Sequence, residues 1–84
     1  MKDKTHWHYG LIKHVEPYGT WYAIHEIYQG EKVGWTTEPI KLVSEDVASL
    51  QHDLELMLQD IKTRDVLIVD ENNNLLRTVN KTEA

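Results

Sequence analysis

The chain has 84 residues, 40% hydrophobic and 27% charged, so we expect one domain (residues 1–84) with a modest core. Its formal net charge is -5 and its 9 Lys and Arg residues are scattered, which argues against binding to nucleic-acid phosphates. No apolar run reaches the roughly 18 residues of a membrane span, and the N-terminus lacks the apolar core of a secretory signal, so we expect a cytoplasmic protein. The lack of cysteine excludes disulfides, thiol nucleophiles and Cys-type zinc sites.

A β-meander is predicted over residues 7–43. Three segments have the composition and alternation typical of strands: residues 7–15, 20–28 and 33–37. The sequence EPYG at 16–19 predicts a hairpin turn between the first two. Pro39 cannot donate a ladder hydrogen bond, so residues 40–43 are expected to continue the third strand only after a bend or along an edge.

The register of the first hairpin decides which side chains share a face of the sheet. A three-residue loop would place Glu16 opposite Thr20. In that register His14 lies on one face and His25 on the other, where His25 meets the helix with Thr36 in reach.

A helix is predicted over residues 45–62, with Ser44 as the N-cap. Its apolar residues gather on one stripe that is expected to pack on the sheet: Val47, Leu50, Leu54, Met57, Leu58 and Ile61. Leu56 points away from this stripe, either as an ordinary exposed leucine or as a contact for a protein partner.

The C-terminal part is predicted to form a hairpin over residues 65–79, followed by a frayed tail at 80–84. The unbroken apolar run Val66–Val69 indicates a strand that is buried on both faces or paired with another chain. The predicted fold is therefore α+β: an antiparallel sheet, made of the meander and the C-terminal hairpin, packed on one α-helix in the order β-β-β-α-β-β.

Histidines are the main candidates for chemistry. His6 and His8, two apart on a strand, project from one face and are the metal-ligand candidates. The predicted register places His8 and His14 on one face and His25 on the other, and the sequence has no zinc-binding motif to add further ligands. A small enzyme or metal-binding protein using His25 with His14 or Glu26 is the alternative function, although adjacent strand residues such as His25 and Glu26 point to opposite faces. We predict no cofactor and no catalytic residue.

Aromatic residues provide the leading hypothesis, because all the Trp and Tyr residues lie in the first 35 positions and suit a half-exposed binding face. One helix covers only one face of a sheet, so the other face needs a cover: the C-terminal hairpin, a second copy of the chain, or a protein partner. We therefore predict a non-enzymatic protein-binding module, and we favour a homodimer over a monomer. Its candidate contact residues are Ile12, Tyr22, Ile24, Glu26, Tyr28 and Leu56.

The segment from 9 to 61, with its hairpin, short third strand and the helix SEDVASLQHDLELMLQDI, resembles the HicB-like antitoxin domain. The stretches TWYAIHEIY and VGWTTEPI also look like a family of small, uncharacterised bacterial proteins. The resemblance implies a small bacterial or phage regulator, an antitoxin-like or inhibitor protein, that binds another protein.

Overall fold

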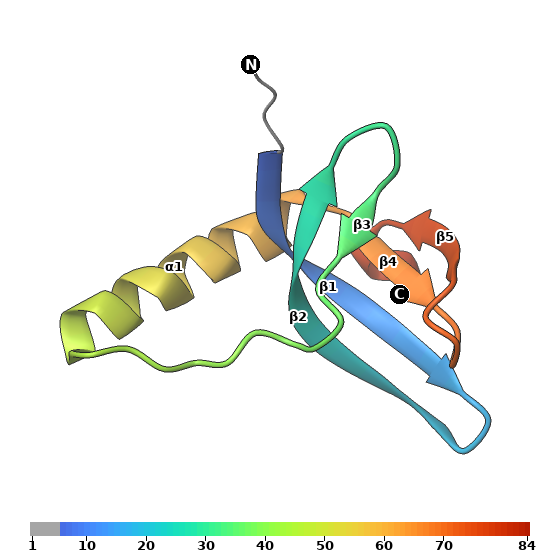
Figure 1. The fold of residues 1–84 in the computed structure, drawn as a ribbon, viewed down its shortest axis with the longest axis horizontal. Coiled ribbons are helices and arrows are strands. Elements are labelled where there is room, and N and C mark those ends of the chain that lie inside the picture. Colours follow the sequence, from blue (N-terminus) through green and yellow to red (C-terminus); the bar gives the residue numbers. More distant parts are fainter. Residues whose placement is uncertain (1–5) are drawn as a thin grey trace.

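The computed structural model describes residues 6–84. Its elements are β1 (His6–Glu16), β2 (Gly19–Gln29), β3 (Gly34–Trp35), α1 (Val47–Thr63), β4 (Val66–Val69), β5 (Leu75–Val79) and a 3-10 turn, η1 (Lys81–Glu83) (Figure 1). The α+β class is confirmed.

All five strands form one sheet in the order β3-β2-β1-β4-β5. β4 is parallel to β1, with Ile12 opposite Leu67, while the other neighbouring pairs are antiparallel. The prediction of a purely antiparallel sheet is therefore wrong. After the meander the chain passes through α1 and returns to the side of β1 that does not pair with β2. β4 pairs there with β1 and runs in the same direction.

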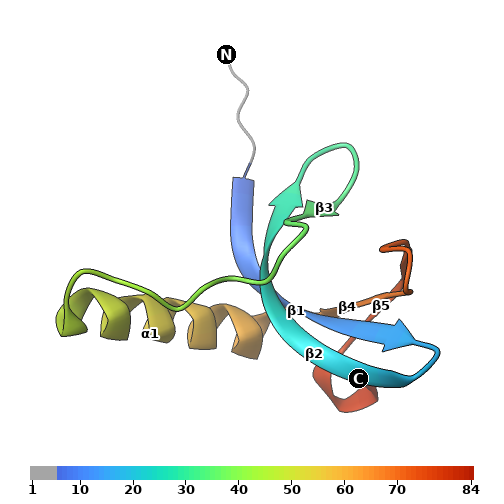
Figure 2. The same ribbon diagram turned by 60° about the horizontal axis from the view of Figure 1, so that its bottom comes forward.

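The sheet carries an apolar cluster on each face. Alternate residues of β4 divide between them, which explains why the whole run Val66–Val69 is buried. One cluster contains Ile12, Ile27, Leu67 and Val69, with Trp35 packed against it. The other contains Val66, Ile68 and Val79, with Leu11 and Ala84. β1 and β2 bend strongly (Figure 2), and the Trp35 indole N–H donates to Asn73 Oδ1 at 2.9 Å, which links β3 to the β4–β5 turn.

The first hairpin has a register one residue away from the predicted one. Glu16 pairs with Gly19, so the loop has two residues rather than three, and Gly10 pairs with His25. Because side chains alternate along a strand, this slip moves every β2 side chain to the other face relative to β1. His14 and His25 therefore share a face, and the prediction that they lie on opposite faces is wrong.

β3 is shorter than the predicted strand over residues 33–37, and residues 40–43 form no strand. Two further backbone hydrogen bonds continue the contact with β2: Thr36 N–H to the Glu26 carbonyl at 3.1 Å and Ile40 N–H to the Ile24 carbonyl at 2.8 Å. Pro39, which has no N–H, lies between them.

The start of α1 and the C-terminal tail also differ from the predictions. α1 begins at Val47, and Asp46, not Ser44, is its N-cap, with a carboxylate oxygen 2.7 Å from the Ser49 N–H. Residues 80–84, expected to fray, form η1 and dock on the sheet: the Ala84 carbonyl accepts hydrogen bonds from Lys13 and Tyr22. The tail thus covers part of the face that carries Leu11.

Candidate functional site

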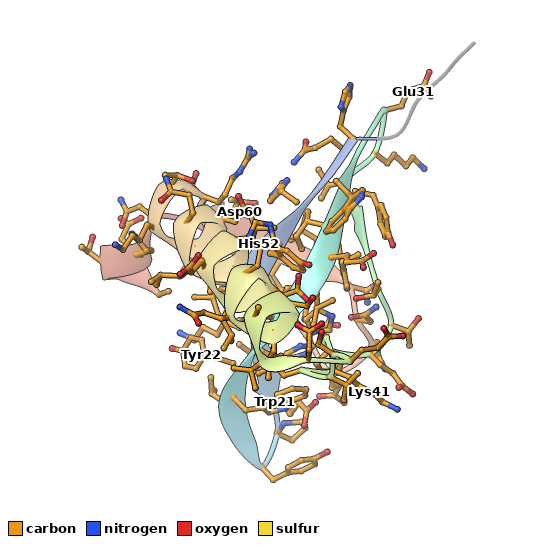
Figure 3. The ribbon with its side chains drawn as sticks, turned by 90° about the vertical axis from the view of Figure 1, so that its left-hand side faces the viewer. Trp21, Tyr22, Glu31, Lys41, His52 and Asp60 are labelled. Atoms are coloured by element: carbon orange, nitrogen blue, oxygen red, sulfur yellow. The ribbon has the colours of Figure 1, made fainter. Side chains whose placement is uncertain are left out.

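Helix α1 is attached to the sheet mainly through its C-terminal half. Met57 is the one helix residue that is buried. The Asp60 carboxylate accepts a hydrogen bond from the Tyr9 N–H at 2.9 Å, and the Lys62 carbonyl accepts one from Lys81 Nζ at 2.7 Å. Figure 3 looks along the helix and shows Asp60 on the side toward β1. The N-terminal half projects beyond the sheet (Figure 1).

The projecting helix carries an exposed apolar row, formed by Val47, Leu54 and Leu58. Their side chains are 80%, 44% and 54% exposed. They lie within about 40° of one another around the helix axis and span about 16 Å along it. Leu42 and Val43, just before the helix, are also exposed.

The prediction that the whole stripe packs on the sheet is therefore wrong for its outer part. Met57 contacts the protein interior, whereas Leu54 and Leu58 do not become buried. A 17-residue helix is about 25 Å long, and only its last turns lie against β1. The exposed row could not be found from periodicity, because periodicity shows which residues share a side but not what covers that side.

Leu56, the helix residue predicted to contact a partner, is 45% exposed. It lies about 200° from Leu54 around the helix axis and so points away from the apolar row. The two leucines have nearly equal exposure on different sides of one helix, which makes them a matched pair for mutagenesis.

The predicted aromatic face is present in part. Tyr22, Ile24, Glu26 and Tyr28 alternate along β2 and share one face. Ile12 does not belong to it: it is fully buried in the cluster on the opposite face, because of the register slip. Tyr22 remains half exposed, although its hydroxyl donates to the Ala84 carbonyl at 3.0 Å.

At the other end of this face the Tyr28 hydroxyl donates to the Glu26 carboxylate. That hydrogen bond to the carboxylate, together with its charge, raises the pKa of Tyr28. Glu26 is half-buried and has a partner within its own strand, so the face is less open than the sequence predicts.

A buried histidine pair lies on the opposite face of the sheet. His25 is fully buried and His14 nearly so, with 3.1 Å between their Nε2 atoms. His25 Nδ1 lies 2.9 Å from the Thr36 carbonyl oxygen, which can only accept, so this nitrogen carries the proton. His25 Nε2 is then the acceptor and His14 Nε2–H the donor. The expected contact with Thr36 is observed, and the contact with His14 was missed because the predicted register separated the two rings.

Both imidazoles are held in the neutral form. Burial lowers the pKa of His25, and burial together with the neighbouring His25 lowers the pKa of His14. His14 also stacks on Trp21, with ring centroids 3.8 Å apart and planes 6° apart. Because both ring nitrogens of His25 are hydrogen-bonded within the protein, the ring has no atom left for a substrate. Glu26 lies on the other face, so the arrangement explains His25 as part of the structure.

The two metal-ligand candidates lie at the start of β1. His6 is exposed, and His8 is half-buried with Nδ1 3.5 Å from Gln29 Nε2. Burial and the nearby Arg64 lower the pKa of His8. Within residues 6–84, no group of three or more His, Cys, Asp or Glu side chains is arranged to hold a metal ion.

His8 also lines a cleft of about 330 Å³ at the C-terminal end of α1. Ile27 and Leu67 contribute apolar surface to it, while Arg64 and Asp65 bring charges of opposite sign. These mixed charges favour no single class of ligand.

No protein family, curated protein or solved structure matches the chain. In the part of the chain that the structure describes, no helix is long and apolar enough to cross a membrane.

Proposed function

We propose that this protein is a non-enzymatic protein-binding module, a small cytoplasmic regulator of the antitoxin or phage-inhibitor kind, that holds a protein partner with α1. The observation that carries the proposal is the apolar row, which is exposed along α1 and begins in the half of the helix that projects beyond the sheet (Figure 1). The half-exposed Tyr22 on β2 is a second contact candidate.

The energetics of the helix support this function. Isolated helices of this length are marginal in water, and most helical stability in proteins comes from packing of the apolar side. Full burial of a Leu or Val side chain contributes about 1.5–3 kcal/mol, so covering the exposed parts of the three row residues would contribute about 3–5 kcal/mol. A protein surface laid on the row supplies this contribution.

The alternative of a small enzyme or metal protein has less support. His25 uses both ring nitrogens internally, and Glu26 is on the other face of the sheet. Neither residue is therefore placed to act on a substrate with the other.

The test is affinity purification of the tagged chain from its own cells, using wild type, Leu54→Glu and Leu56→Glu. We expect wild type and Leu56→Glu to retain the same protein, which can include untagged copies of the chain, and Leu54→Glu to lose it. Circular dichroism should show equal helix content and thermal midpoints for both variants. Retention of the partner by Leu54→Glu, or its loss only in Leu56→Glu, would show that the row is not the binding surface.

A further inference from the structure

We propose that the partner on the apolar row is the same row of a second copy of this chain, with the two α1 helices antiparallel across a two-fold axis. This inference rests on the proposed function, because it names the partner of the same surface. Three features of α1 favour this partner: the spacing of its apolar residues, the charges at its ends and the way in which it meets its own sheet.

The spacing of the apolar residues favours a helix as the partner. The residues of the exposed row are seven and four positions apart, steps that return to the same side of a helix and are typical of helix-to-helix packing: Val47, Leu54 and Leu58. α1 is the only α-helix in residues 6–84, so a second helix must come from another molecule.

The chain's own sheet leaves room for that second helix. Met57 marks the side of α1 that is buried against its own chain. Leu58 lies about 100° from Met57 around the helix axis. Together with Val47 and Leu54 it forms a separate, exposed edge of the stripe. A second helix along this edge therefore extends the existing apolar packing rather than replacing it.

The charges at the helix ends select the antiparallel arrangement. Glu45 and Asp46 precede the first turn, and Lys62 lies in the last. Hydrogen bonding from Ser49 lowers the pKa of Asp46, so its charge is retained. Antiparallel helices bring Lys62 of one copy to within one helical turn of Glu45 of the other, along the axis, and oppose the helix dipoles favourably. Parallel helices would place the acidic ends together, in a chain whose net charge is already -5.

Antiparallel pairing of the complete row places Val47 opposite Leu58 of the second copy. The contact is isologous, as expected for a two-fold dimer. Three row residues per copy, joined by the exposed Leu42 and Val43, make an interface at the small end of the range for specific contacts, below about 1,200 Å². We therefore expect a reversible dimer with a dissociation constant in the micromolar range.

The first experiment measures mass by sedimentation equilibrium over a hundredfold range of concentration. Wild type and Leu56→Glu should shift from the 9.9 kDa monomer to a dimer, and Leu54→Glu should remain monomeric with at least a tenfold weaker association. Lys62→Glu and Glu45→Lys should each weaken the dimer severalfold, and the variant carrying both changes should regain it.

The second experiment uses the absence of cysteine in the chain. Under mild oxidation, a mixture of Val47→Cys and Leu58→Cys chains should form a disulfide-linked heterodimer, while Val47→Cys alone should not cross-link. Efficient cross-linking of Val47→Cys with itself would indicate a parallel pair and overturn the antiparallel arrangement.

The outcomes separate this inference from the proposed function. If wild type stays monomeric throughout while Leu54→Glu still abolishes retention of a different protein, the self-association is wrong and the binding function stands. If wild type neither dimerises nor retains any protein, both are wrong.

Discussion

Replacement of Gly10 by alanine is the sharpest test of the hairpin register. Gly10 lies opposite His25, and a Cβ atom on it would be 2.6 Å from Ile27 Cγ1. Real Cβ atoms do not approach carbon so closely, so β1 or Ile27 must move. Ile27 is 1% exposed and packs in a core cluster, which leaves it little space to do so.

Overpacking of a core by one carbon lowers the free energy of unfolding by about 1–3 kcal/mol. Alanine has fewer conformations than glycine in the unfolded chain, and this raises the free energy of unfolding by about 0.4–1 kcal/mol. The net destabilisation of Gly10→Ala should be about 1–2 kcal/mol. For a domain of 60–100 residues each kcal/mol lowers the thermal midpoint by about 4–8 °C, so we expect a decrease of about 5–15 °C.

The assay is thermal unfolding followed by circular dichroism, at one protein concentration for all variants because association raises the midpoint. Gly34→Ala is the matched control: Gly34 is also a strand glycine, and a Cβ there would meet nothing within 4 Å. Its midpoint should be unchanged or slightly higher. Equal midpoints for the two variants would refute the close approach of Ile27 to Gly10 and the register that produces it.

Three further predictions concern the histidine pair and the helix cap. The folded pKa values of His14 and His25 lie below the ordinary value of 6.5, so the unfolded chain binds more protons than the folded chain as the pH falls. Urea unfolding should therefore show the full free energy of unfolding above pH 6.5 and a loss as the pH falls through the folded pKa values. A gain in stability on acidification would contradict the neutral pair. His25→Leu leaves the His14 N–H and the Thr36 carbonyl without their partner, so it should cost about 1–3 kcal/mol and flatten that pH dependence. Asp46→Ala should cost about 1 kcal/mol of stability through loss of the N-cap, whereas Ser44→Ala should change it by less than about 0.5 kcal/mol, and equal effects would show that Asp46 is not the cap.

Local patterns in the sequence were sufficient to place most of the elements. The period of two located β1 and β2, and the helical period located α1 to within two residues. The run Val66–Val69 predicted a strand that is buried on both faces or paired with another chain, and the structure shows the first of these. These features follow from backbone geometry and from the requirement that apolar side chains leave water, both of which act over a few residues.

The pairing and register of the strands could not be predicted from these local patterns. Whether the loop after Glu16 has two residues or three is a small local difference, yet it decides whether His14 and His25 meet or face apart. The parallel entry of β4 beside β1 depends on the path of the whole crossover.

The candidate binding surface shows the same division. The sequence by itself determined that α1 has an apolar stripe, because the stripe follows from the spacing of its residues. Only the tertiary structure decided that Met57 is covered by the chain while Val47, Leu54 and Leu58 are not, because cover depends on where the helix meets β1.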